Sequence, residues 1–214
     1  DDVESRGLGD VYKRQITIIR HAPTKYNKHE IFMGTKNIPA DVRELGGDKI
    51  NAIRSNRYIQ RVNTWYSSPL SRALDTAKAA SINKDIIVDE RLIERCLGDW
   101  EGVSKAIVQK KYPDAFIDGK MDFYHTPVNG ETYEKFVLRI SELIIEKCKE
   151  TRDLVFVTHN GVFRVMKSLF TGKPLGDVFL EFEPYLIPQT FVVTDEILEK
   201  IVTNPFYTAD EKQR

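Results

Sequence analysis

Two short apolar segments of this sequence each end directly in a histidine. Residues 16–20 (ITIIR) precede His21, and residues 154–158 (LVFVT) precede His159. Short runs rich in β-branched residues are typical of strands that are buried in a parallel sheet. Open α/β sheets bind their ligands beyond the carboxyl ends of the strands. The sequence therefore predicts that both histidines lie near one ligand site.

Strand patterns alternate with helix patterns along the rest of the chain. Further strands are predicted at 62–66, 86–88, 189–194 and 197–202, and helices at 48–60, 68–81, 103–111, 132–149 and 161–170. The period of apolar residues is clearest in 132–149, where it indicates a helix face packed against the core. We therefore expect an α/β fold, a three-layer α/β/α sandwich with a mostly parallel central sheet, in one domain over residues 16–205.

Two arginines are predicted to join the histidines. Arg20 directly precedes His21, and Arg72 lies in the first turn of the helix that Ser68 and Pro69 are expected to begin, since serine is a good N-cap and proline fits the first helical position. The planar guanidinium group matches the geometry of a phosphate. Helix N-termini near Pro69 and Gly161 would add backbone N–H donors. Together these groups indicate a pocket for a phosphoryl group.

The chemistry of such a pocket follows from the imidazole group. Nearby guanidinium groups disfavour a second positive charge, so they should keep His21 neutral and nucleophilic toward phosphorus. The protein's own cations would stabilise the transferred group, which predicts a reaction without metal or cofactor. A leaving oxygen needs a proton, and four acids of the loop 89–102 compete for that role on chemistry alone: Glu90, Glu94, Asp99 and Glu101.

Composition narrows the possible partners and the compartment. The chain has 32 basic residues (Lys and Arg) and 32 acidic residues (Asp and Glu). This charge balance gives no indication of nucleic acid or an anionic membrane as partner. No apolar run approaches the ~20 residues that span a bilayer. Cys96 and Cys148 are predicted to be free thiols, which favours the cytoplasm. Residues 1–15 are expected to be a non-native or disordered leader, and 206–214 a polar tail. The oligomeric state is not readable.

Five segments, taken in chain order, resemble the motifs of the histidine phosphatase superfamily, the phosphoglycerate mutase-like proteins. They are ITIIRHAPTKYN, YSSPLSRALDTA, LIERCLGDWEG, NGETYEKFVLRI and VFVTHNGVFR. The resemblance implies that His21 accepts the phosphoryl group and that Glu94 is the proton donor. It also implies the remaining site residues: Arg20, Arg72 and His159 in the phosphate pocket, Asn27 as a further phosphate contact, and Gly34 in a turn that lines the pocket.

The resemblance also distinguishes branches of the family. Asn160 stands where the acid phosphatase and phytase branch has its aspartate donor, and we count it among the substrate-binding residues. In the loop 89–102, the donor loop, the glycolytic mutases have a sequence similar to Glu-Arg-His-Tyr-Gly. This chain has Glu-Arg-Cys-Leu-Gly at residues 94–98, and the difference favours a phosphatase. Two departures stand out: Ala22 replaces the usual glycine after the nucleophile, and Met33 replaces a polar residue near the pocket mouth.

We therefore expect a metal-independent phosphomonoester hydrolase that acts on a small phosphorylated molecule. The alternatives are a cofactor-dependent phosphoglycerate mutase-type phosphotransferase and a non-catalytic binder of a phosphorylated ligand, in which Ala22 would have spoiled the site by crowding the phosphate. Substrate specificity is expected to reside in segments 22–47 and 103–130, which should cap the pocket.

Overall fold

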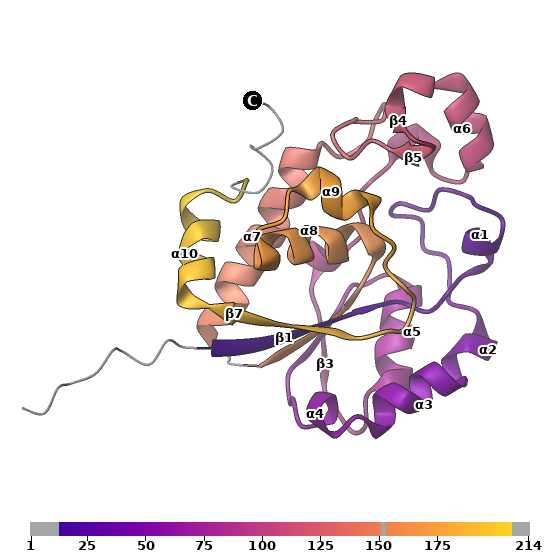
Figure 1. The fold of residues 1–214 in the computed structure, drawn as a ribbon. Coiled ribbons are helices and arrows are strands. Elements are labelled where there is room, and N and C mark those ends of the chain that lie inside the picture. The colour runs from indigo at the N-terminus through magenta and orange to yellow at the C-terminus, as the bar shows by residue number, and fades with distance from the viewer. Residues whose placement is uncertain (1–12, 151–152, 207–214) are drawn as a thin grey trace, which may run out of the picture.

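The sheet carries the fold and has the expected mixed but mostly parallel topology (Figure 1). A computed structural model describes residues 13–150 and 153–206. Its strand order is β3-β2-β6-β1-β7, in which only β7 runs antiparallel to its neighbour. The strands are β1 (Lys13–Arg20), β2 (Trp65–Ser67), β3 (Ile86–Val88), β6 (Leu154–Thr158) and β7 (Gln189–Thr194).

Helices cover both faces of this sheet, which confirms the three-layer arrangement (Figure 1). One face packs against α7 (Tyr133–Glu150), α8 (Asn160–Thr171) and α10 (Asp195–Thr203); the other packs against α3 (Asp48–Ser55), α4 (Arg57–Gln60) and α5 (Ser71–Ala80). Because successive strand residues point to opposite faces, Ile16 and Ile18 belong to the first core and Ile19 to the second.

The predicted apolar face of α7 forms a large part of the first core. Phe136, Val137, Ile140, Leu143 and Ile144 are each at most 2% exposed. Full burial of such side chains stabilises the fold by about 1.5–3 kcal/mol each. The face is therefore mainly core, and of these five side chains Phe136 also lines a cavity.

Short elements lie beyond the carboxyl ends of the parallel strands (Figure 1). Residues 22–47 contribute α1 (Lys25–Lys28) and α2 (Val42–Leu45), and the donor loop contributes the 3-10 turns η1 (Glu90–Leu92) and η2 (Gly98–Trp100). Residues 103–130, called the cap from here on, supply α6 (Lys105–Lys111), η3 (Pro113–Ala115) and a hairpin of β4 (Phe116–Ile117) and β5 (Lys120–Met121). The helix α9 (Leu175–Leu180) follows α8. A separate small core of Trp100, Val108 and Ala115 holds the cap.

One predicted strand is wrong, because residues 197–202 lie in the helix α10. The side chain of Thr194 accepts a hydrogen bond from the backbone N–H of Ile197, so it caps the helix, and Asp195 and Glu196 follow in the first turn. Acidic residues near a helix N-terminus are stabilising. Ile197 and Ile201, four residues apart, then face the core together.

Several boundaries also differ from the prediction. The strand predicted at 62–66 begins at Trp65, and the helix predicted from Ser68 begins at Ser71. The first strand starts at Lys13, so residues 13–15 belong to the sheet rather than to a leader. Phe206 packs against the first core, so the domain extends through it. The rest of the predicted leader, 1–12, and of the predicted tail, 207–214, lies outside the described residues.

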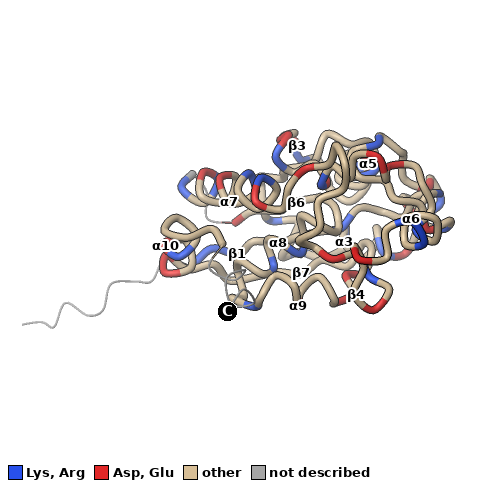
Figure 2. The backbone as a smooth tube through the Cα atoms, turned by 90° about the horizontal axis from the view of Figure 1, so that it is seen from above, with Lys and Arg blue, Asp and Glu red and all other residues tan. Residues whose placement is uncertain are grey.

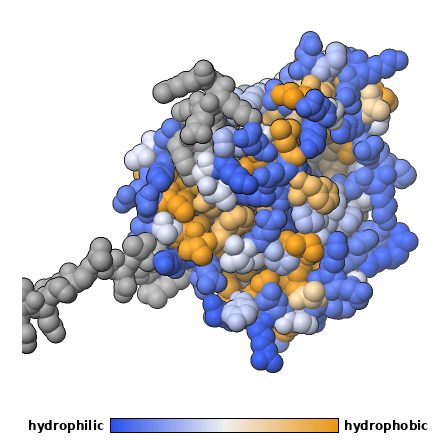
Figure 3. All heavy atoms as spheres, viewed as in Figure 1, coloured by the Kyte–Doolittle hydropathy of each residue, from blue (hydrophilic) through white to orange (hydrophobic). Residues whose placement is uncertain are grey.

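Charge and hydropathy vary over short distances on the surface. Figure 2 shows acidic and basic residues interspersed along the elements. The face seen in Figure 3 is mostly polar, with separate small apolar patches. Among the residues that the structure describes, no helix has the length and apolar character that crossing a membrane requires.

Candidate active site

His21 and His159 meet at the carboxyl ends of two neighbouring strands, as the sequence predicts. In the parallel pair β1–β6, Arg20 lies opposite Thr158, so the next residue of each strand is a histidine. The backbone N–H of His21 donates to the carbonyl of Thr158 at 2.9 Å. The two imidazole ring centroids are 5.1 Å apart. The register of the sheet therefore fixes the histidine pair.

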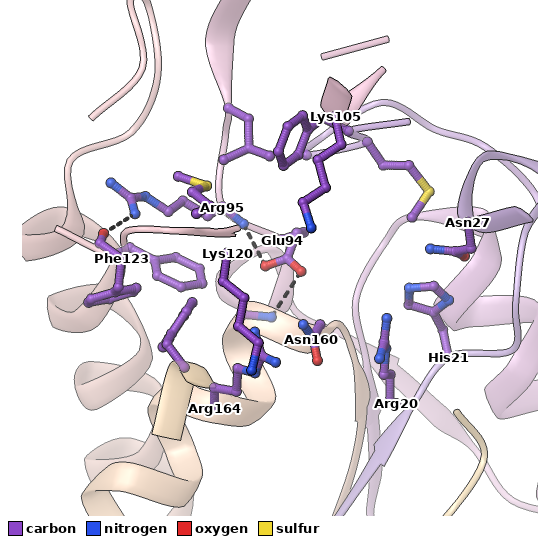
Figure 4. Close-up of a pocket in the computed structure, with 18 of the residues that line it drawn as sticks. Arg20, His21, Asn27, Glu94, Arg95, Lys105, Lys120, Phe123, Asn160 and Arg164 are labelled. Carbon is purple, nitrogen blue, oxygen red and sulfur yellow. Dashed lines mark hydrogen bonds between the residues drawn. The ribbon is translucent and has the colours of Figure 1, made fainter. Parts of the chain in front are cut away.

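The backbone sets the tautomer of His21. Its Nδ1 lies 2.7 Å from the carbonyl oxygen of Ala22, and a carbonyl can only accept, so Nδ1 carries the proton. The lone pair is then on Nε2, and the ring faces the cavity (Figure 4). Burial, followed by the charges of Arg72 and Arg20, holds the pKa of His21 well below its ordinary value. The imidazole ring is thus neutral at physiological pH.

His159 is held in the opposite tautomer. Arg72 Nε donates to its Nδ1 at 3.2 Å, so Nε2 carries the proton and donates to Ser68 Oγ at 2.7 Å. The side chain is fully buried, and burial, then Arg72 and His21, keep its pKa well below the ordinary value. The sequence predicts Ser68 to be the N-cap residue of α5, but its hydroxyl accepts the hydrogen bond from His159 instead. The residue that precedes the helix is Leu70, whose side chain makes no capping hydrogen bond.

Arg72 is also fully buried, and backbone carbonyls orient its guanidinium group. It donates to Gly34 O at 2.8 Å and to Lys36 O at 2.7 Å. Gly34 has φ +49°, and a Cβ there would lie 2.0 Å from Glu101 Oε1. Only glycine fits this turn, which lines the cavity and holds the arginine.

Arg20 is clamped by a segment in which the sequence shows no motif. Its Nη1 donates to the carbonyl of Glu183 at 2.5 Å, and its guanidinium lies 3.7 Å from the ring centroid of Tyr185. Its Nε is buried and has no hydrogen-bond partner among the described residues. Burial lowers the pKa of this arginine, although it stays charged. The buried N–H is suited to an anionic ligand.

Of the four candidate acids in the donor loop, only Glu94 lines the cavity. One carboxylate oxygen accepts from the N–H of Arg95 at 2.9 Å, and the other accepts from the N–H of Gly161 at 3.0 Å. The carboxylate therefore sits at the N-terminus of α8 and faces the cavity (Figure 4). Glu101 instead accepts from the backbone of Thr35 and Leu97.

Both predicted asparagines line the cavity. Asn27 Oδ1 accepts from Thr24 N at 2.9 Å and from Thr24 Oγ1 at 3.0 Å, which leaves its amide N–H groups for a ligand. Asn160 is the first residue of α8, and its Oδ1 is buried without a partner in the described part of the chain. All eight predicted site residues thus come together around one cavity, with His159 directly behind His21.

Ala22 fits the site without strain. It is not among the residues with positive φ, and its side chain is fully buried in the second core. Its N–H donates to Thr76 Oγ1 at 2.9 Å, and Thr76 in turn donates to the carbonyl of Arg72 at 2.6 Å. The methyl group therefore faces the core, and the crowding that would have spoiled the site is absent.

The cavity extends well beyond the predicted residues. Its volume is about 390 Å³, enough for a small metabolite. Sequence reasoning missed its apolar walls and four further cations, which come mainly from the donor loop, the cap, α8 and α9: Phe32, Met121, Phe123, Phe136, Phe179, Phe182, Arg95, Lys105, Lys120 and Arg164. Within the described ranges no group of three or more His, Cys, Asp or Glu side chains could hold a metal ion.

Known proteins share this sequence pattern and fold. Glucosyl-3-phosphoglycerate phosphatase of Mycolicibacterium vanbaalenii is 27% identical over 175 residues, 77% of each chain. Phosphoglycerate mutase-like protein 4 of Arabidopsis thaliana is 30% identical over 165 residues, 72% of this chain and 70% of that one. A structure of mycobacterial glucosyl-3-phosphoglycerate phosphatase complexed with VO3 shares the fold with a TM-score of 0.73, at 22% identity over 85% of this chain and 97% of that one.

The family assignment follows from the length of the match. Residues 16–183 match the model of the histidine phosphatase superfamily (branch 1). This range includes both histidines, both arginines and the glutamate that the structure gathers around the cavity. The chain therefore belongs to the histidine phosphatase superfamily.

Proposed function

We propose that this histidine phosphatase hydrolyses small phosphomonoesters through a phosphohistidine on His21, without a metal ion. The observation that carries the proposal is the fixed tautomer of His21, which presents Nε2 to the cavity between Arg20 and Arg72. A neutral, preorientated imidazole beside two guanidinium groups combines a nucleophile with charge stabilisation for the transferred group.

The first step is an in-line displacement. Nε2 of His21 forms a bond to phosphorus while the bond from phosphorus to the ester oxygen breaks, and Glu94 gives its proton to that leaving oxygen. Arg20, Arg72 and the amide of Asn27 line the space around the phosphoryl oxygens. His159 takes part by holding Arg72 through its Nδ1.

The second step regenerates the enzyme. Water attacks phosphorus and gives a proton to the Glu94 carboxylate, and the electron pair of the N–P bond returns to Nε2 of His21. The carbonyl of Ala22 stabilises the positive charge on the ring while the phosphoryl group is attached, because Nδ1 still donates to it. Phosphatase-named relatives support hydrolysis over transfer to a second substrate.

Trapping the intermediate tests this proposal. Acid-labile, alkali-stable label from a ³²P-labelled aryl phosphate should appear on His21, and vanadate but not EDTA should inhibit turnover. His21→Gln should take no label, whereas His29→Gln, a change at an exposed histidine, should label normally. Retained hydrolysis in His21→Gln would refute the nucleophile, and turnover that requires a bisphosphorylated primer would identify a mutase instead.

A further inference from the structure

Arg164 has a buried donor that the protein does not satisfy. It lies on α8, its Nη2 donates to the carbonyl of Glu181, and its guanidinium lies 5.2 Å from the ring centroid of Phe179. Its Nε is buried and has no hydrogen-bond partner among residues 13–150 and 153–206. An unsatisfied buried N–H costs about 1–3 kcal/mol, so such a group is expected to face a ligand acceptor.

Lys120 reaches the same end of the cavity from the cap hairpin. Its Nζ donates to the carbonyl of Leu180, the residue before the one that Arg164 contacts. The two cationic groups are therefore brought together at the C-terminal end of α9, and their side chains approach each other in Figure 4. The ammonium group has three donors, so two remain for a ligand.

The two cations at this end of the cavity are not held in direct ion pairs. Neither Arg164 nor Lys120 forms an ion pair with a carboxylate within the described part of the chain. The nearby carboxylate of Glu181 is engaged by two other lysines, at 2.5 and 3.0 Å. Burial, and then the charge of Arg20, lowers the pKa of Arg164 to about 10, so it remains charged at neutral pH. The charges of Glu183, Glu94 and Glu181 act on Arg164 from a distance, and the two unpaired cations remain available to an anion.

Apolar side chains line the cavity together with these cations. Phe123, Phe136, Phe179 and Met121 form its walls, and the ring centroids of Phe123 and Phe179 are 4.1 Å apart. Such walls accommodate an apolar or aromatic body better than a polyhydroxylated one. A ligand that satisfies both the phosphoryl pocket and Arg164 must therefore carry two separated anionic groups.

We infer that Arg164 and Lys120 form a second anion-binding subsite, which selects phosphomonoesters with a further anionic group, a carboxylate or a second phosphate, on an apolar body. The inference rests on the proposed function for the identity of the first group, the phosphomonoester. Arg164 and Lys120 are then specificity-determining residues that take no part in the phosphoryl transfer itself.

The test compares three aryl phosphates that differ only in the para substituent. The probes are 4-carboxyphenyl phosphate, its neutral isostere 4-carbamoylphenyl phosphate, and 1,4-phenylene bisphosphate. A charge-assisted contact should raise kcat/KM for the carboxylate over the carboxamide by about 10- to 100-fold. Arg164→Gln should bring this ratio close to one, and Lys120→Gln should lower it. The bisphosphate distinguishes a phosphate-preferring subsite from a carboxylate-preferring one.

Two controls keep the subsite and the chemistry separate. Arg43→Gln removes an arginine whose side chain is 83% exposed on α2, and it should leave the ratio unchanged. Calorimetric titration of the same probes into His21→Gln and His21→Gln/Arg164→Gln measures the preference without turnover. A preference that is absent, or equally large without Arg164, would overturn the subsite, whereas binding preference without phosphate release would refute only the proposed function.

Discussion

The replacement Gly161→Ala tests the placement of Glu94 without altering any ionisable group. A Cβ at residue 161 would lie 2.3 Å from Glu94 Oε1 and 3.1 Å from Phe136 Cζ. Ordinary contact begins near 3.4 Å, so the carboxylate must move by about 1 Å, away from the N–H that now binds it. A shift of about 1 Å in a reacting group costs on the order of 100-fold in rate. We therefore expect kcat for phenyl phosphate to fall about 100-fold.

The assay can locate the loss in the steps that need Glu94. With 4-nitrophenyl phosphate the leaving group departs without a proton, so Gly161→Ala should retain a stoichiometric burst of nitrophenol and lose steady-state turnover. With phenyl phosphate the burst itself should slow. The helix should not suffer, because alanine is favoured over glycine in helices by about 0.5–1 kcal/mol.

Gly46→Ala is the matched control, since a Cβ at residue 46 meets nothing within 4 Å, and its kinetics should equal those of the parent. A folded Gly161→Ala protein that turns over phenyl phosphate at the parent rate would refute the reasoning. In that case the position of Glu94 would not limit the reaction, and another proton donor would have to be sought.

Two further predictions concern stability. The pKa values of His21 and His159 are depressed in the folded state. Below about pH 6.5 the unfolded chain therefore binds protons that the folded chain does not. The free energy of unfolding should then fall by up to about 1.4 kcal/mol for each histidine and each unit by which the pH is lowered. Denaturant titrations at pH 7 and 5.5 measure this slope; it should be shallower in His21→Gln, and an equal slope there would contradict the explanation. Ala22→Gly should keep kcat/KM and lose about 1 kcal/mol of stability, since it removes a methyl group from the core; a gain in activity would show that the methyl group does crowd the phosphate.

The sequence was sufficient for the histidine pair because both residues directly follow buried strands. The register that places Arg20 opposite Thr158 leaves little freedom in where the next residues can lie. Arg72 is fixed similarly by the first turn of α5. Glu94 needed the family resemblance, since residue chemistry alone did not separate it from its acidic neighbours. The structure separates them by position, because Glu94 reaches the N-terminus of α8 and Glu101 turns toward Thr35.

Long-range contacts without a local pattern could not be predicted. Ser68 has the features of an N-cap residue, yet its hydroxyl accepts from His159, which lies 91 residues away in the chain. Glu183 and Tyr185 hold Arg20 through a backbone carbonyl and a ring face, neither of which a motif specifies. The strand predicted at 197–202 failed for the opposite reason: a short apolar run fits a strand or a helix, and the cap at Thr194 decides between them.

The two ends of the cavity depend on different parts of the fold. The tautomer of His21 and the orientation of Arg72 depend on backbone groups after β1 and in the turn at Gly34, together with His159 at the end of β6. The Arg164 end depends on the β4–β5 hairpin and on carbonyls at the end of α9. Because the hairpin contributes no hydrogen bond to His21 or Arg72 among the described residues, we expect changes in it to alter which molecule is bound while His21 keeps its geometry. The inferred subsite and the proposed phosphoryl chemistry thus rest on different parts of the domain, which is why the motifs predict the reaction and not the substrate.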